Sequence, residues 1–257
     1  MVCFFVILLT FAASASGQVL PKAELRPETT KAFEDYVRGR EARILSQRIN
    51  GGKFLWADDS DARRARIRGG ELLIEPFHDR GFVEVKGGLI HDWIGAAFLP
   101  NTTLPKLLAT IQNYDNHKNL YPEVSDSRMV SREGNQFRVR LRLIKKKVIT
   151  VVLNTDHEIT YFPLDATRQH SRSRTTRIAE LEGSHELTPG DDHGLLWNLN
   201  SFWRFLERDG GVWIECEAIS LTRGIPTGLG WLVTPIVREL PRESLTHTLE
   251  GTRRALR

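Results

Sequence analysis

The sequence predicts an α+β fold in which a curved antiparallel sheet wraps around a long helix at the C-terminal end. Apolar residues alternate with arginines from residue 137 to residue 143, the period of a strand with one apolar face. Turn residues separate the strand-like runs that follow, at residues 148–164, 168–182, 194–206 and 212–222. The only long helical segment downstream covers residues 225–256, so it is expected to cover the apolar face of the sheet.

The N-terminal segment predicts a secretory signal peptide over residues 1–17. An apolar run at residues 2–11 is followed by small residues at 12–17, and polar sequence begins at Gln18. We expect cleavage after Ala15 or Gly17 and a secreted or periplasmic mature protein. The alternatives are a buried N-terminal helix or a membrane anchor, but the run is shorter than the roughly 20 residues that span a bilayer.

The two cysteines agree with this processing. Cys3 leaves with the signal peptide and Cys216 remains, so neither an intramolecular disulfide nor a cysteine metal cluster is expected. Cys216 lies between Ile214 and Ala218 in an alternating strand, which favours a buried, unreactive thiol. A nucleophilic role would require a nearby base and an exposed position.

The charge is mildly positive. A net charge of +4 suits contact with an anionic surface such as lipid headgroups, and it is too small to predict nucleic-acid binding. The densest basic run, Lys145 to Lys147, falls between two predicted strands and is expected to be a solvated turn.

Residues 18–86 are expected to form an N-terminal extension of one helix and short strands. The helix is capped by Thr29 or Thr30, continues to about Ile49, and ends at the glycines 51–52. A charged loop or short helix is expected at residues 58–68. Two short strands are then expected, at residues 71–75 and 81–85.

The main domain is expected over residues 87–257. Residues 88–100 are almost continuously apolar and predict a strand buried on both faces. A capping signal at Thr102 or Thr103 starts a helix at 103–113, and a second short helix or turn follows at 114–121. Near the C-terminus, Pro241 fits the first turn of the final helix. The leucines that share one helical face there are Leu245, Leu249 and Leu256.

The order of these elements from Gly88 to Arg257 resembles the START-type helix-grip superfamily, which includes birch-pollen-allergen-like proteins and polyketide cyclase and lipid-transport domains. Residues 98–100, 110–130 and 208–235 also resemble that family's entry into the first helix, its passage through the second, and its last strand. The resemblance covers about two thirds of the chain and excludes residues 18–86. It implies a hydrophobic cavity between sheet and helix. Members bind lipids, sterols, hormones or polyketides, and some are cyclases.

The two asparagines of the predicted strand at residues 194–206 can face either side of the sheet. Asn198 and Asn200 share a face with Leu196 and Phe202, and facing inward they would orient a ligand in an apolar pocket. Facing outward, as polar strand residues usually do, they would leave tryptophans 197 and 203 inside. The ligand-binding residues expected in the cavity are His91, Trp93, Leu141, Trp197, Asn198, Asn200, Ile214 and Trp231.

Two pairs of titratable residues have a catalytic and a structural interpretation. Glu215 and Glu217 share a strand face and could act as acid and base, but a surface charge ladder with Arg172 and Arg174 is favoured. The neighbours at 91 and 92, His and Asp, point to opposite faces of a strand and form no dyad, so a structural histidine is favoured.

No metal or cofactor site is expected. The remaining histidines lack the spacing of a zinc site, and the glycines near residue 228 do not form a phosphate-binding loop. No nucleophile elbow of the G-x-S-x-G type is present.

The function expected is non-covalent binding, and carriage, of an apolar small molecule or lipid, with contact to a membrane surface. Each buried methylene of the ligand would contribute about 0.8 kcal/mol. Release would occur through motion near residues 224–235. Two alternatives stay open: a cyclase- or hydrolase-type enzyme that uses His91, Asp92 or an arginine in the cavity, and a structural module whose pocket is filled by its own side chains.

Overall fold

The computed structural model describes residues 20–146, 150–225, 228 and 239–257. The expected signal peptide, Lys147, Trp231 and most of the segment expected to move on release lie outside the described residues. Within the described part of the chain, no helix combines the length and the apolar character needed to cross a membrane.

A large antiparallel sheet of ten strands organises the molecule. Its order along the main path is β2-β4-β12-β11-β8-β7-β6-β5, with β3 paired to β4 and β9 paired to β8. The strands are β2 (Leu73–Pro76), β3 (Phe82–Val85), β4 (Gly88–Pro100), β5 (Val124–Glu133), β6 (Gln136–Lys146), β7 (Thr150–Pro163), β8 (Arg168–Glu182), β9 (His185–Glu186), β11 (Asn198–Arg208) and β12 (Gly211–Arg223). A separate pair joins β1 (Ala23–Glu24) to β10 (Asp191–Asp192).

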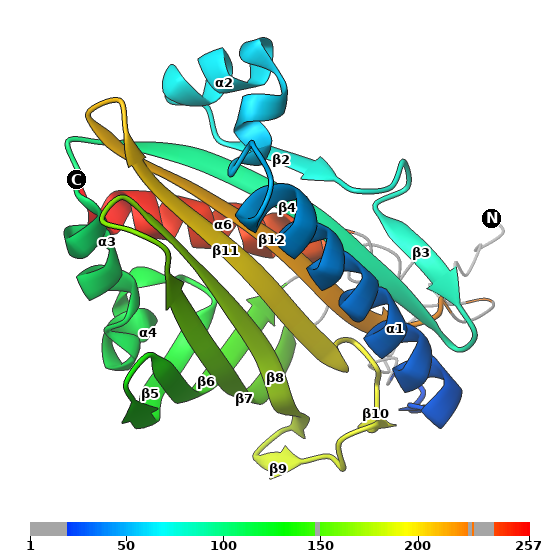
Figure 1. Ribbon diagram of the computed structural model, residues 1–257. Helices are drawn as coiled ribbons and strands as arrows, with labels where there is room; N and C mark the ends of the chain where they lie inside the picture. The colour runs from blue at the N-terminus through cyan, green and yellow to red at the C-terminus, as the bar shows by residue number, and fades with distance from the viewer. Residues whose placement is uncertain (1–19, 147–149, 226–227, 229–238) are drawn as a thin grey trace, which may run out of the picture.

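The helices lie on both faces of this sheet. The helical segments are α1 (Pro27–Ile44), η1 (Leu45–Ile49), η2 (Trp56–Asp59), α2 (Asp61–Arg68), α3 (Leu104–Ile111), η3 (Tyr114–Asn116), α4 (His117–Leu120) and α6 (Leu240–Ala255). In Figure 1, α1 and α6 lie on opposite faces of β4, β12 and β11. We call the face toward α6 the concave face and the face toward α1 the convex face.

The C-terminal helix packs on the concave face as the sequence predicts. Leu245 and Leu249 are buried in one apolar cluster with Val139 and Ile214. Gly95 makes this close packing possible: a Cβ there would lie 2.6 Å from Leu249 Cδ1, far inside van der Waals contact. The α+β class and the wrapping of the sheet around the last helix are therefore confirmed, and this is the helix-grip arrangement.

The N-terminal extension is built into the same sheet. Strands β2 and β3 both pair with β4, and the expected boundary between residues 86 and 87 falls in the turn that joins β3 to β4. Helix α1 covers the convex face, where Phe33 and Val37 pack with Ile90 and Ile219. Both faces of the central strands are therefore buried, which explains the continuous apolar sequence of β4.

Two local expectations need correction. Lys145 and Lys146 belong to the end of β6 rather than to a solvated turn, and Lys145 pairs with Glu123 at only 15% side-chain exposure. Strand β11 begins at Asn198, four residues later than expected, because Gly194 adopts a positive φ of 67° and the chain turns there.

Candidate functional site

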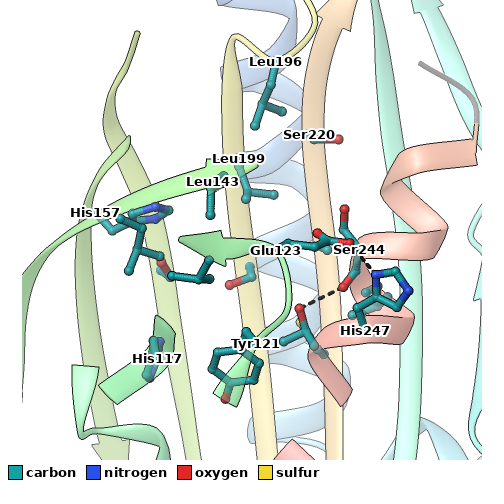
Figure 2. A pocket seen from close by; sticks show the side chains of 18 of the residues that line it. His117, Tyr121, Glu123, Leu143, His157, Leu196, Leu199, Ser220, Ser244 and His247 are labelled. Carbon is teal, nitrogen blue, oxygen red and sulfur yellow. Dashed lines mark hydrogen bonds and ion pairs between the residues drawn. The ribbon is translucent and has the colours of Figure 1, made fainter. Parts of the chain in front are cut away.

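A cavity lies between the concave face of the sheet and α6 (Figure 2). Its volume is about 310 Å³, which falls at the lower end of the range of small-molecule sites. Strands β6, β7, β8, β11 and β12 supply one wall, and α6 with the α3–α4 region supplies the other. The apolar residues that line it include Ile111, Leu141, Leu143, Leu153, Leu199 and Leu245.

Small side chains on three adjacent strands create the space. Ser173 on β8 pairs directly with Ser201 on β11, which pairs with Ala218 on β12. All three residues line the cavity, together with Cys216 two residues before Ala218. Because these paired residues are small, they leave open space above the sheet, which is the floor of the cavity. The larger leucines and valines of β6 and β7 form its side.

Two neutral histidines line the cavity. Nε2 of His117 lies 2.9 Å from the carbonyl oxygen of Ile111, and Nε2 of His157 lies 2.8 Å from Thr155 Oγ1. Burial lowers the pKa of both imidazoles, that of His157 to about 4. Near neutral pH, both rings therefore offer uncharged polar groups.

Two tyrosines form another polar contact in the wall. The hydroxyl oxygens of Tyr114 and Tyr161 are 2.9 Å apart, so one donates to the other. Burial raises the pKa of both phenols, which keeps them protonated. The ring of Phe137 packs against both, which fixes the pair in place.

Three titratable side chains line the more exposed part of the cavity, and we call them the charged rim: Glu123, Lys145 and His247. The carboxylate of Glu123 pairs with the Lys145 ammonium and lies 2.5 Å from Nδ1 of His247. Figure 2 shows Glu123 and His247 next to each other at the edge of α6. The rim therefore links α6 to β6 and to the segment before β5.

Of the described residues expected to bind ligand, Leu141 lines the cavity. Ile214 and Trp93 belong to the cluster beneath α6 and lie outside the cavity wall. His91 is fully buried on β4, the strand that pairs with the wall strand β12. Its Nε2 lies 2.9 Å from the hydroxyl of Thr222, a β12 residue that lines the cavity. This position agrees with a structural histidine, and burial lowers its pKa to about 4.

The amides of β11 face away from the cavity. Alternation along the strand directs Leu199, Ser201 and Trp203 inward, so Asn198 and Asn200 point to the convex face. Asn198 Oδ1 accepts a hydrogen bond of 3.0 Å from the Thr175 hydroxyl. The expectation that these two amides face inward and bind the ligand is therefore wrong.

Trp197 also needs correction, because it lies before β11 begins and does not follow the alternation. Its ring packs in the cluster that contains Phe33 of α1, and its Nε1 donates to Asp192 Oδ1 at 2.9 Å. It therefore anchors the extension rather than lining the cavity.

Glu215 and Glu217 are buried, and the predicted surface ladder is wrong. Arg40 of α1 donates to Glu217 at 2.9 Å, and Arg204 donates to Glu215 at 3.0 Å. The expected partners bond elsewhere, Arg172 to Glu41 and Arg174 to Glu158. The ladder fails because α1 and η2 cover this part of the convex face, and two backbone N–H groups of η2 also donate to Glu215.

Asp92 belongs to the same convex-face network. Arg40 Nε lies 3.0 Å from Asp92 Oδ2, and the Tyr36 hydroxyl donates to that oxygen at 2.8 Å. His91 and Asp92 therefore offer no acid–base pair to the cavity, and the described residues that line it include no arginine. The groups expected to carry a cyclase or hydrolase activity therefore do not line this cavity in the described part of the chain.

Cys216 lies in the floor of the cavity and is 2% exposed, as the alternation predicts. Burial raises the pKa of its thiol. Among the described residues, no group of three or more His, Cys, Asp or Glu side chains is arranged to hold a metal ion.

Sequence reasoning missed most of the polar groups of the cavity. The serines of β8 do alternate at strand period, Ser171 with Ser173, and this signal was available in the sequence. The charged rim gave no such signal, because its three members are brought together only by the packing of α6 near β5 and β6.

Several solved structures are similar to this chain. TTHA0849 from Thermus thermophilus has 16% identity and a TM-score of 0.48, and the match covers 63% of this chain and 94% of that one. The STAR-related lipid transfer protein from Xanthomonas axonopodis has 13% identity and a TM-score of 0.46, over 68% and 98% of the two chains. Human STARD10 has 9% identity and a TM-score of 0.45, over 77% and 79%.

The likeness is one of fold. No family model matches the sequence, and no curated protein matches it either. The function must therefore be argued from the cavity of this chain.

Proposed function

We propose that this protein binds a largely apolar small molecule or lipid non-covalently in the cavity between the sheet and α6. The observation that carries the proposal is the cavity itself, about 310 Å³ in volume and lined mainly by apolar and aromatic side chains. Burial of apolar ligand surface there would contribute about 25 cal/mol per Å².

One helix both covers the cavity and packs in the core of the fold. Leu245 of α6 belongs both to the cavity wall and to the apolar core, so the helix that covers the ligand is held by the same contacts as the fold. The charged rim marks the more exposed part of the wall, with exposed side-chain fractions from 15% to 36%. A ligand with an apolar body and a polar end would place that end at the rim.

A cavity-filling substitution tests the proposal. Ala218→Phe adds a ring to the floor, whereas Ala62→Phe adds the same ring on exposed α2 and serves as the control. Titration with N-phenyl-1-naphthylamine should give a fluorescence increase for the parent and for Ala62→Phe. Ala218→Phe should lose at least about tenfold in affinity, equivalent to about 1.4 kcal/mol. Equal binding by all three folded proteins would contradict the proposal.

We also infer that the protein is exported from the cytoplasm. The support is the apolar run at residues 2–11 followed by small residues at 12–17. N-terminal sequencing of the exported protein should then begin near Ser16 or Gln18. Exported material that still begins at Met1 would contradict cleavage.

A further inference from the structure

We propose that the ligand of this cavity carries hydroxyl groups along its body, and that the protein recognises them through a polar band on the cavity floor. We define the polar band as His157, Ser173, Ser201 and Ser220, which all line the cavity. They lie on four adjacent strands, β7, β8, β11 and β12. The inference rests on the proposed function, because it specifies the ligand of the same site.

The strand register makes the band continuous. Ser173 and Ser201 are direct cross-strand partners, and such pairs have Cβ atoms about 4.5–5.5 Å apart. His157 and Ser220 each lie about two residues further along the same face, at the diagonal distance of about 7–8 Å. Ser171 extends the band by one more hydroxyl on β8.

The serine hydroxyls lack protein partners. Ser171 and Ser220 are only 3% and 5% exposed, and neither hydroxyl has a hydrogen-bond partner among the described residues. Neither oxygen is among the fully buried polar atoms without a partner, so both remain accessible from the cavity that these serines line. If the floor needed only small side chains, alanine would serve, as Ala218 does on the same floor. The hydroxyls are therefore suited to a polar partner inside the cavity.

The histidine adds the direction of the hydrogen bond. The Thr155 hydroxyl donates to the Leu141 carbonyl oxygen at 3.3 Å, so it accepts from His157 Nε2 at 2.8 Å. Nε2 then carries the proton, and Nδ1 is an acceptor without a partner among the described residues. Burial lowers the pKa of this ring to about 4, which keeps Nδ1 free to accept near neutral pH.

These groups define the chemistry of the ligand. An acceptor nitrogen needs a donor, which a hydroxyl supplies and a ketone or carboxylate does not. Serine hydroxyls both donate and accept, so they match hydroxyls as well. The rest of the wall, including Leu141, Leu143 and Leu245, requires an apolar framework. An elongated, apolar ring system with several hydroxyls fits both requirements better than a plain acyl chain.

A pair of matched probes tests the proposal. Cholic acid and lithocholic acid share a ring system and a carboxylate side chain, and they differ in the number of ring hydroxyls. Isothermal titration calorimetry should show tighter binding of cholic acid by the parent. The double variant Ser173→Ala/Ser201→Ala should lose about tenfold for cholic acid and much less for lithocholic acid. His157→Phe, which keeps a ring and removes the acceptor, should act in the same direction.

The control is Ser131→Ala, on the exposed part of edge strand β5, which should bind both acids like the parent. Thermal melting would confirm that each variant is folded. Equal losses for the two acids, or no loss, would overturn the proposal, because the serines would then only provide space. If neither acid binds while N-phenyl-1-naphthylamine does, the hydroxyl proposal fails and the proposed function stands. If no probe enters the cavity, the proposed function fails.

Discussion

Arg40 on α1 and Asp92 on β4 form a buried ion pair, with 3.0 Å between Arg40 Nε and Asp92 Oδ2. The same guanidinium donates to Glu217 on β12, so one arginine joins the N-terminal helix to two strands of the sheet. The ring of Phe77 stacks on it, with its centroid 3.3 Å from the guanidinium carbon. The extension is therefore fixed to the convex face by charge as well as by apolar packing.

Removing this arginine should be strongly destabilising. Arg40→Ala would leave Asp92 and Glu217 buried without their cation, and such losses cost about 3–5 kcal/mol. Arg38→Ala is the matched control, since Arg38 lies on the same helix with 72% of its side chain exposed and should change stability by less than about 0.5 kcal/mol. Urea denaturation of both variants measures this. Similar stabilities for the two variants would show that the pair does not hold α1.

The buried carboxyl group predicts a specific pH dependence. Burial, with the nearby charge of Glu217, raises the pKa of Asp92 to about 7, whereas an unfolded aspartate has a pKa of about 3.9. Between these values the folded state keeps a proton that the unfolded state has lost. The contribution of Asp92 to stability is therefore present at about pH 4 and falls as the pH rises to about 7.

Asp92→Asn isolates this effect from the other buried groups. The free energy of unfolding of the parent, relative to that of the variant, should decline between pH 4 and pH 7 and then level off. Denaturant midpoints measured across this range give the difference directly. A difference that stays constant, or that grows with pH, would contradict the raised pKa.

The thiol in the cavity floor should be unreactive in the folded protein. Cys216 is 2% exposed, and burial raises its pKa, so little thiolate is available for attack. A Cys3→Ser background leaves Cys216 as the single thiol of the full chain. Labelling with a thiol reagent should be slow in buffer and fast in urea. Rapid labelling without denaturant would place this part of the cavity floor in contact with solvent.

The sequence alone predicts those features that have a local period. The alternation in β6 and the leucines of α6 predict the sheet, the final helix and their contact, and the structure confirms all three. A local sequence pattern does not predict which residues far apart in the chain become partners. Arg40 and Glu217 are 177 residues apart, so the sequence does not show that they are partners. From the sequence alone, the carboxylates of β12 therefore look like members of an exposed cross-strand charge ladder. The polar band has the same origin, because only the register of four strands assembles it.

The packing of α6 makes a quantitative prediction. Leu249 is fully buried, and its side chain occupies the position next to Gly95 that a Cβ would fill. Leu249→Ala should therefore cost about 2–5 kcal/mol of unfolding free energy. Arg254→Ala on the exposed side of the same helix is the control and should cost less than about 0.5 kcal/mol. If urea melts of Leu249→Ala matched those of the parent, the helix would not be packed on the sheet in this way.

Native mass spectrometry of the gently purified protein tests the central claim, the binding of a small molecule between sheet and α6, most directly. The parent should carry an added mass of a small molecule that is lost on denaturation, and Ala62→Phe should carry it too. Ala218→Phe, whose new ring would occupy the cavity floor, should be free of it. An added mass that persists in folded Ala218→Phe at the parent's level would contradict binding in this cavity.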